Sequence, residues 1–148
     1  MSGFRTLRLA DLFVGQRFAS ASHRVTAEEI KTFARQFDPQ PFHLDEEAAK
    51  DSLFGGLVAS GWHTGAITMR LLAEGGLPFE SGIIGGGGEL RWLKPVRPGD
   101  TLRAESEILS ITPSRSRPGQ ARVEVRVETL NQEGEVVQSF VPGLVVTR

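Results

Sequence analysis

The segment between Leu57 and Met69 constrains the fold more than any other part of this chain. It contains no residue with a formal charge, and apolar residues lie all round a helix drawn through it. A helix that is apolar on every side is stable in water only when other parts of the protein cover it. The sequence therefore predicts a central helix from Leu57 to about Glu74, buried by the rest of the chain.

The second half of the chain has the pattern of a covering sheet. Polar and apolar residues alternate one by one over Thr101–Ile108 and Arg122–Glu128. Alternation of this kind predicts antiparallel strands with one face on the core. Further strands are predicted over residues 83–93 and 136–147, and turns at 98–100 and 131–134.

Two shorter helices are predicted before the central one. Thr26 and Glu29 have the spacing of a capping box, and apolar residues follow at helical intervals, which predicts a helix over residues 27–37. Asp45 is placed to cap a second short helix that extends to Lys50. Since helices come early and strands late, we expect an α+β fold in which an antiparallel sheet wraps around the central helix.

The chain of 148 residues shows no linker, repeat or low-complexity tract, and it is expected to form one domain over residues 1–148. A sheet in so short a chain leaves an edge exposed, which predicts a homodimer or a dimer of dimers. The run Gly85–Gly88 is followed by no Gly-Lys-Ser/Thr, so it is not a phosphate loop. We expect it to let a strand pass close to the central helix or to a ligand.

Composition excludes several classes of function. The net charge of −1 predicts no affinity for nucleic acid or for anionic membranes, and the absence of cysteine excludes disulfides and thiolate chemistry. The three histidines are scattered, which predicts no metal site. Residues 1–6 lack a basic-then-apolar leader, and no apolar stretch is long enough to span a membrane, so a cytoplasmic protein is expected.

The loop Asp38-Pro39-Gln40-Pro41-Phe42-His43 carries the candidate chemistry. Its prolines restrict the backbone, so we expect a stiff segment that is neither helical nor a central strand. The loop holds one carboxylate and one imidazole. An imidazole titrates near neutral pH and a nearby carboxylate can orient a water, so the pair is suited to general acid–base catalysis.

Several blocks of this sequence together resemble the MaoC-like hydratase/dehydratase family, which includes the (R)-specific enoyl-CoA hydratases. The blocks are Phe33-Ala34, Asp38-x-Gln40-Pro41-x-His43-Leu44-Asp45, Ala48-Ala49, Phe54-Gly55-Gly56, Ala59-Ser60-Gly61 and Lys94-Pro95-Val96-x-Pro98-Gly99-Asp100. The resemblance covers about half of the chain and departs from the family at two points. Gln40 replaces a common asparagine, and no serine stands near Thr68 and Met69.

The resemblance implies a hot dog fold and the hydration of trans-2-enoyl thioesters of CoA or acyl-carrier protein, or the reverse dehydration, without a metal or redox cofactor. It implies that Asp38 and His43 hold and activate the water, and that the backbone N–H of Gly61 polarises the thioester carbonyl. Gly56 and Ser60 are candidates for the wall of the substrate pocket.

Other interpretations of these residues stay open at this point. Asp38 can be a turn residue before proline, His43 a packed histidine bonded to a carbonyl, and Gly61 a small residue required by helix packing. His63 is expected to be a buried and hydrogen-bonded imidazole. The sequence does not assign the base within the Asp38/His43 pair. At the level of the whole protein, the alternatives are a non-catalytic acyl-CoA-binding protein and an acyl-CoA thioesterase.

Overall fold

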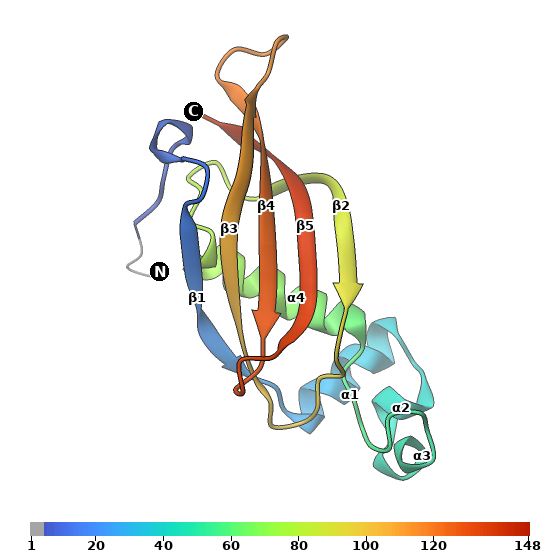
Figure 1. Cartoon of the computed structure of the whole chain (residues 1–148). Coiled ribbons are helices and arrows are strands. Elements are labelled where there is room, and N and C mark those ends of the chain that lie inside the picture. Colours follow the sequence, from blue (N-terminus) through green and yellow to red (C-terminus); the bar gives the residue numbers. More distant parts are fainter. Residues whose placement is uncertain (1–4) are drawn as a thin grey trace.

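The computed structural model describes residues 5–148, so most of the N-terminal segment considered for an export signal lies outside it. A five-stranded antiparallel sheet curves over one central helix (Figure 1). The strands are β1 (Arg17–Arg24), β2 (Ile84–Trp92), β3 (Thr101–Pro113), β4 (Gln120–Leu130) and β5 (Val136–Thr147), in the spatial order β1-β3-β4-β5-β2. This architecture confirms the predicted α+β arrangement.

Helices occupy the first half of the chain, as predicted. They are α1 (Ala27–Phe37), α2 (Pro41–Leu44), α3 (Glu46–Lys50) and α4 (Gly61–Leu71), with a 3-10 turn η1 (Leu9–Asp11) and a π-helical turn η2 (Leu72–Gly76). Within residues 5–148, no helix has both the length and the hydropathy needed to cross a bilayer.

Local capping explains why two helices begin where the sequence predicts. The Thr26 hydroxyl accepts the Glu29 N–H at 3.2 Å, and the Glu29 carboxylate accepts the Thr26 N–H at 3.0 Å, so the capping box of α1 is complete. Asp45 accepts the N–H of Glu47 at 2.9 Å and caps α3. One expectation about the intervening loop is wrong. Residues 41–44 form a helical turn, because Pro41 occupies the first helical position, where no N–H is needed.

The central helix α4 begins later than predicted, at Gly61 rather than Leu57. Before it, the N–H of Val58 donates to the carbonyl of Phe42 at 3.1 Å, and the N–H of Ala59 donates to the carbonyl of Val96 at 2.9 Å. These bonds hold the segment against its neighbours, and the Ser60 hydroxyl then accepts the Trp62 N–H and caps the helix. The helix continues into η2, where the backbone leaves the helical conformation at Glu74 and Gly75.

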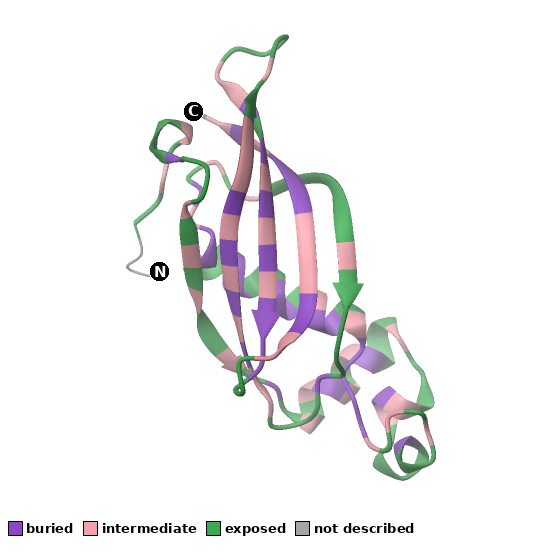
Figure 2. Ribbon diagram, viewed as in Figure 1, coloured by how far each residue is buried: buried purple, intermediate pink, exposed green. Residues whose placement is uncertain are grey.

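The expectation that α4 is buried on every side is also wrong for a single chain. Trp62 and Met69 are 61% and 40% exposed, and Ala66 between them is exposed as well. The opposite side of the helix is buried against the sheet, with Thr64, Ile67 and Leu71 among its contacts with the core. An apolar stripe of α4, formed by Trp62, Ala66 and Met69, therefore stays uncovered. Figure 2 shows exposed segments along this helix.

The concave face of the sheet forms the core with α4. Alternate residues of β3 and β4 point inward and are buried, as the alternation of the sequence predicts: Leu102, Ala104, Ser106 and Ile108 on β3, and Ala121, Val123, Val125, Val127 and Thr129 on β4. Burial of each large aliphatic side chain contributes about 1.5–3 kcal/mol. This layer fixes the sheet over the helix that carries Gly61.

The glycine run lies in β2, at an edge of the sheet. A side chain on Gly88 would lie 2.6 Å from the carbonyl oxygen of Val141 and from the Cα of Pro142, both on β5. The register between β2 and β5 also shifts between Gly85 and Gly88. The close approach that excludes a side chain at Gly88 is therefore an approach to β5. The expected approach of this strand to the central helix does not explain the glycine.

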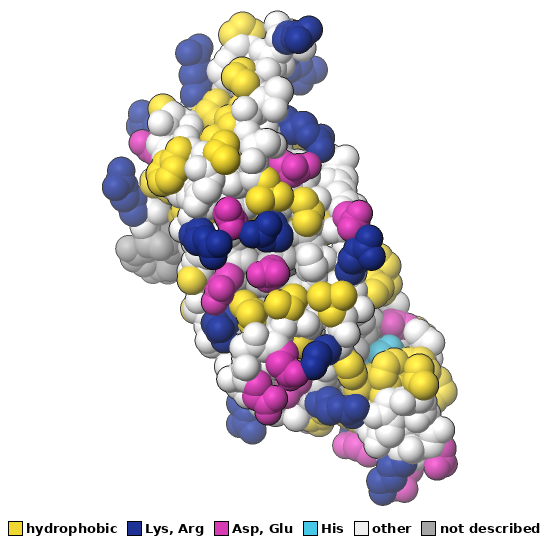
Figure 3. All heavy atoms as spheres, viewed as in Figure 1, with side chains coloured by type: hydrophobic (Ala, Val, Ile, Leu, Met, Phe, Trp, Pro, Cys, Tyr) yellow, Lys and Arg dark blue, Asp and Glu magenta, His cyan; other side chains and the backbone are white. Residues whose placement is uncertain are grey.

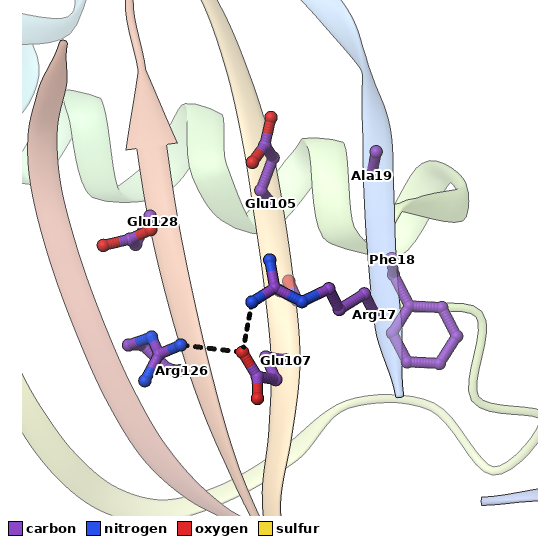
Figure 4. Close-up of a pocket in the computed structure, with 8 residues that line it drawn as sticks. Arg17, Phe18, Ala19, Glu105, Glu107, Arg126 and Glu128 are labelled. Atoms are coloured by element: carbon purple, nitrogen blue, oxygen red, sulfur yellow. Dashed lines mark hydrogen bonds and ion pairs between the residues drawn. The ribbon is translucent and has the colours of Figure 1, made fainter. Parts of the chain in front are cut away.

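The convex face of the sheet carries interspersed positive and negative side chains (Figure 3). The Glu107 carboxylate accepts from Arg17 at 3.0 Å and from Arg126 at 2.8 Å. These charges line a hollow of about 250 Å³ between β1, β3 and β4 (Figure 4). Because these groups neutralise one another on an exposed face, this hollow has the character of a solvated surface rather than a reactive site.

Candidate active site

A cavity of about 460 Å³ lies where α2, the start of α4 and the end of β2 meet. It contains three of the residues selected from the sequence: Asp38, His43 and Gly61. Much of the remaining wall is apolar, and includes Phe42, Phe54, Val58, Trp62, Trp92 and Val96. A concave apolar site with a few convergent polar groups is the usual form of a small-molecule site.

Asp38 ends α1 and is held by two side-chain donors. The Ser60 hydroxyl donates to Oδ2 at 2.7 Å, and the Gln40 amide donates to Oδ1 at 2.6 Å. Burial raises the pKa of this carboxyl, but these two hydrogen bonds and the nearby His43 lower it further than burial raises it. The net pKa lies below the ordinary value, so Asp38 is a carboxylate at neutral pH.

His43 lies on α2 and is buried, with only 5% of its surface exposed. Its Nδ1 is 2.7 Å from the carbonyl oxygen of Val58. A carbonyl can only accept, so we assign the proton of the neutral ring to Nδ1. Nε2 then carries the free lone pair, 3.4 Å from Oδ2 of Asp38. The backbone contact considered as an alternative for His43 thus exists, and it orients the ring toward Asp38.

Gly61 is the first residue of α4, where backbone N–H groups have no partner within the helix. Within residues 5–148, its N–H donates to no protein acceptor. A side chain here would lie 2.5 Å from the ring of Trp92, so only glycine fits beneath this indole. The helix dipole adds a partial positive charge at this end, which favours a developing negative charge nearby.

Ser60 and Gly56 do not line the cavity. Ser60 is fully buried, and its hydroxyl both holds Asp38 and caps α4. Sequence reasoning selected this serine but not its contact with Asp38, which lies 22 positions away. Gly56 lies instead beside the guanidinium of Arg97, 3.3 Å from where a side chain would begin.

The other two histidines lie on a separate hollow of about 360 Å³ between α4, β1 and α1. His63 is buried, as predicted, and stacks on Phe33 with ring centres 4.7 Å apart. Burial lowers its pKa, and among the described residues its Nδ1 has no hydrogen-bond partner, so the expected hydrogen bond is missing there. His23 pairs with Glu29 at 2.9 Å. Within residues 5–148, no three His, Asp or Glu side chains gather as metal ligands would.

Comparison with known proteins agrees with this fold and with the sequence motifs. Residues 13–131 match the family model of the MaoC like domain. The crystal structure of a MaoC-like dehydratase from Rhodospirillum rubrum is 63% identical and superposes with a TM-score of 0.94, over 96% of this chain and 97% of that chain.

Two further relatives extend the comparison. The uncharacterized protein YdeM of Bacillus subtilis is 36% identical over 129 residues, 86% of this chain and 89% of that protein. The R-hydratase PhaJ1 from Pseudomonas aeruginosa is 28% identical with a TM-score of 0.77, over 97% of this chain and 87% of that chain. The chain has the hot dog fold and belongs to the MaoC-like hydratase/dehydratase family.

Proposed function

We propose that this protein adds water to the double bond of trans-2-enoyl thioesters of CoA or acyl-carrier protein, or removes water from 3-hydroxyacyl thioesters. The observation that carries the proposal is the convergence of Asp38, His43 and the free N–H of Gly61 on one apolar cavity. The similarity to the R-hydratase PhaJ1 supports the same reaction class.

In this proposal Gly61 stabilises the negative charge that develops on the thioester oxygen. Attack of water on the β-carbon moves the electrons of the double bond toward the carbonyl, which gives an enolate. A fixed N–H at a helix N-terminus stabilises the negatively charged enolate oxygen more strongly than it stabilises the neutral carbonyl oxygen of the bound substrate. Stabilisation that is stronger in the transition state accelerates the reaction.

Asp38 and His43 act on the water as a unit. Oδ2 and Nε2 are close enough to accept both protons of one water, which directs its oxygen lone pairs toward the substrate. One O–H bond breaks as the C–O bond forms at the β-carbon, and the pair delivers a proton to the α-carbon. Either residue can be the base in this scheme, since a coupled pair shares its protons.

The proposed reaction needs neither a metal nor a redox cofactor. Water supplies both the hydroxyl group and the proton, so the substrate undergoes no net oxidation or reduction. The two side chains and one N–H account for each proton and for the charge on oxygen. The thioester of CoA or acyl-carrier protein and water are therefore the two reactants in the scheme.

We further infer a homodimer. Strand β2 is an edge of the sheet, and exposed apolar residues lie on it and on the adjacent stripe of α4, namely Ile84, Trp92, Trp62 and Met69. Apolar patches next to an unpaired edge mark association sites. The dimer or dimer of dimers stays a prediction, which the mass of the protein in solution tests.

Hydration of crotonyl-CoA, followed by loss of enoyl-thioester absorbance, tests the proposed function. We expect the wild-type protein to consume the substrate and His43→Ala to be slower by about 10²–10⁴-fold, the usual contribution of a positioned acid–base group. A thiol reagent should detect no free CoA. Release of CoA would identify a thioesterase, and acyl-CoA binding without turnover would identify a non-catalytic binding protein.

Replacing Gln40 with Ala should move the acid limb of the kcat/KM profile to higher pH. The Gln40 amide stabilises the ionised form of Asp38, and its loss raises the pKa of that carboxyl. Fewer molecules then carry the carboxylate at a given acidic pH, so activity disappears earlier as the pH falls. Crotonyl-CoA hydration, measured from acidic to neutral pH and normalised to each maximum, checks this result.

The matched control is Gln16→Ala, at a partly buried glutamine that bonds the backbone of η1 and the loop after it. Its acid limb should coincide with that of the wild type. If Gln40→Ala coincides as well, the group that titrates in the acid limb is not Asp38.

A further inference from the structure

The indole of Trp92 packs against the first turn of the central helix. Trp92 ends β2, beside the start of α4 (Figure 1). Three of its ring atoms lie 2.5–2.8 Å from where a side chain on Gly61 would begin. Its ring also meets the ring of Trp62 edge to face, with centres 4.9 Å apart. The indole therefore contacts the two residues that open α4.

The first turn of a helix is the turn that the helix itself restrains least. Its N–H groups have no partner within the helix, and a glycine has the greatest backbone freedom of any residue. Gly61 also has no side chain that could anchor it. The Ser60 hydroxyl is one restraint on this turn, because it accepts the Trp62 N–H. Contact with the indole of Trp92 is a second restraint, and it acts on Gly61 directly.

A hydrogen bond to Gln138 fixes the indole in this position. Burial alone does not fix it, because Trp92 is 45% exposed. Its N–H donates to Oε1 of Gln138 at 3.0 Å, across a directly paired position of β2 and β5. An indole N–H can only donate, so the amide oxygen of Gln138 must face it. Gln138 is 1% exposed and thus connects a solvent-accessible ring to the core.

Two threonine hydroxyls hold the amide of Gln138 within the core. Its nitrogen donates to the Thr68 hydroxyl at 3.1 Å. The Thr68 hydroxyl uses its one proton to donate to the carbonyl of Thr64 at 2.8 Å, so the Thr129 hydroxyl, 2.7 Å away, must be the donor in the contact between them. Since each of these buried side chains is bonded, Gln138 presents its oxygen to Trp92 in one orientation.

We propose that Gln138 is a positioning residue, which anchors Trp92 and, through the indole, directs the Gly61 N–H toward the thioester oxygen. The inference rests on the proposed hydratase function and adds to it a residue outside the wall of the cavity. Stabilisation of an oxyanion depends on the position of the donor, and the bond strengthens as charge develops on the oxygen. The contribution of Gln138 is therefore greater to the transition state than to the bound substrate.

The first variant is Gln138→Leu, which removes the acceptor with little change in volume. The Thr68 hydroxyl keeps its bonds to Thr64 and Thr129, so the variant should fold. We expect kcat for crotonyl-CoA to fall about 10- to 10²-fold, with a smaller change in KM, because a displacement of about 1 Å in a positioning group has an effect of that size. Thr129→Val is the matched control. It removes a hydroxyl from the same network without a contact with Trp92, and its kcat should equal that of the wild type.

Trp92→Phe tests whether the indole transmits the effect. This variant keeps an aromatic ring but lacks the N–H that Gln138 accepts. In the double variant, the two losses in kcat should not add, since both substitutions remove one anchor. Additive losses, or a wild-type kcat in Gln138→Leu, overturn the inference. If Gln138→Leu does not fold, Gln138→Met replaces it in the cycle, because the flexible methionine also lacks the amide oxygen.

The amide resonance of Gly61 separates this inference from the proposed function. Butyryl-CoA has no double bond, so it reports the contact without catalysis. Its binding should move the Gly61 amide proton to lower field in the wild type, and by less in Gln138→Leu. If the wild type hydrates nothing but this shift depends on Gln138, the positioning role is correct and the hydratase function is wrong. Hydration together with equal shifts in both proteins means that the function is correct and the positioning role is wrong. Absence of both the shift and hydration overturns both.

Discussion

Replacing Asp38 with Asn should lower kcat for crotonyl-CoA hydration by about 10²–10⁴-fold while the affinity for butyryl-CoA changes little. Asparagine has nearly the same shape, and its carbonyl can still accept from Ser60. It cannot take a proton from water, and its amide replaces a carboxylate that the site keeps ionised. Stopped-flow absorbance gives kcat, and calorimetric titration gives the affinity.

Asp45→Asn is the matched control, because it makes the same substitution seven positions along the chain and outside the cavity. Asparagine caps a helix about as well as aspartate, so α3 should persist and activity should stay at the wild-type level. An equal loss of binding and turnover in Asp38→Asn would contradict a catalytic role and indicate that this carboxylate supports the fold.

Gly61→Ala should damage both stability and activity. The new methyl group would lie 2.5 Å from the Trp92 ring, so the indole or the first turn of α4 must move. Overpacking of this kind costs about 1–3 kcal/mol, and a displacement of about 1 Å in a positioning group can reduce turnover by about 10²-fold. Denaturant unfolding and crotonyl-CoA kinetics measure the two effects.

Gly65, one turn further along α4, provides the comparison. A methyl group there would meet the Gln138 side chain at 3.7 Å, which is an ordinary contact. Alanine is favoured over glycine inside a helix, so Gly65→Ala should gain about 0.5–1 kcal/mol. If both alanine variants behave alike, the space beneath Trp92 is not what requires glycine at position 61.

Elements with strong local signals could be predicted from the sequence. Helix α1 has the predicted bounds because its capping box and apolar spacing lie within the helix itself. Strand β5 has its predicted bounds as well.

Strand β1 was not predicted, because it is a largely exposed edge strand whose pairing with β3 involves residues far away in sequence. The predicted start of α4 at Leu57 is too early, because the apolar run includes the extended residues before Ser60. Serine is a preferred N-cap residue, so Ser60 marks the true start in the sequence.

The candidate site was only partly visible in the sequence. Asp38 and His43 could be selected because one short segment carries both. The contacts that orient them come from Val58 and Ser60, which the fold brings in from 15 and 22 positions away. The position of Trp92 against Gly61 depends on the pairing of β2 with β5, and no local pattern reports it. Sequence therefore indicated the chemical groups, whereas tertiary structure determines their orientation.

A single hydroxyl group joins the acid–base pair to the order of the central helix. Ser60 uses its proton to hold Asp38 and its lone pair to cap α4, and it does both while fully buried. Fraying of the first helical turn would therefore release the carboxylate and the N–H of Gly61 in the same event. Asp38 and the N–H of Gly61 therefore lose their positions together when this one turn opens. On heating, we expect activity to be lost when the turn opens, at or below the temperature at which the sheet unfolds.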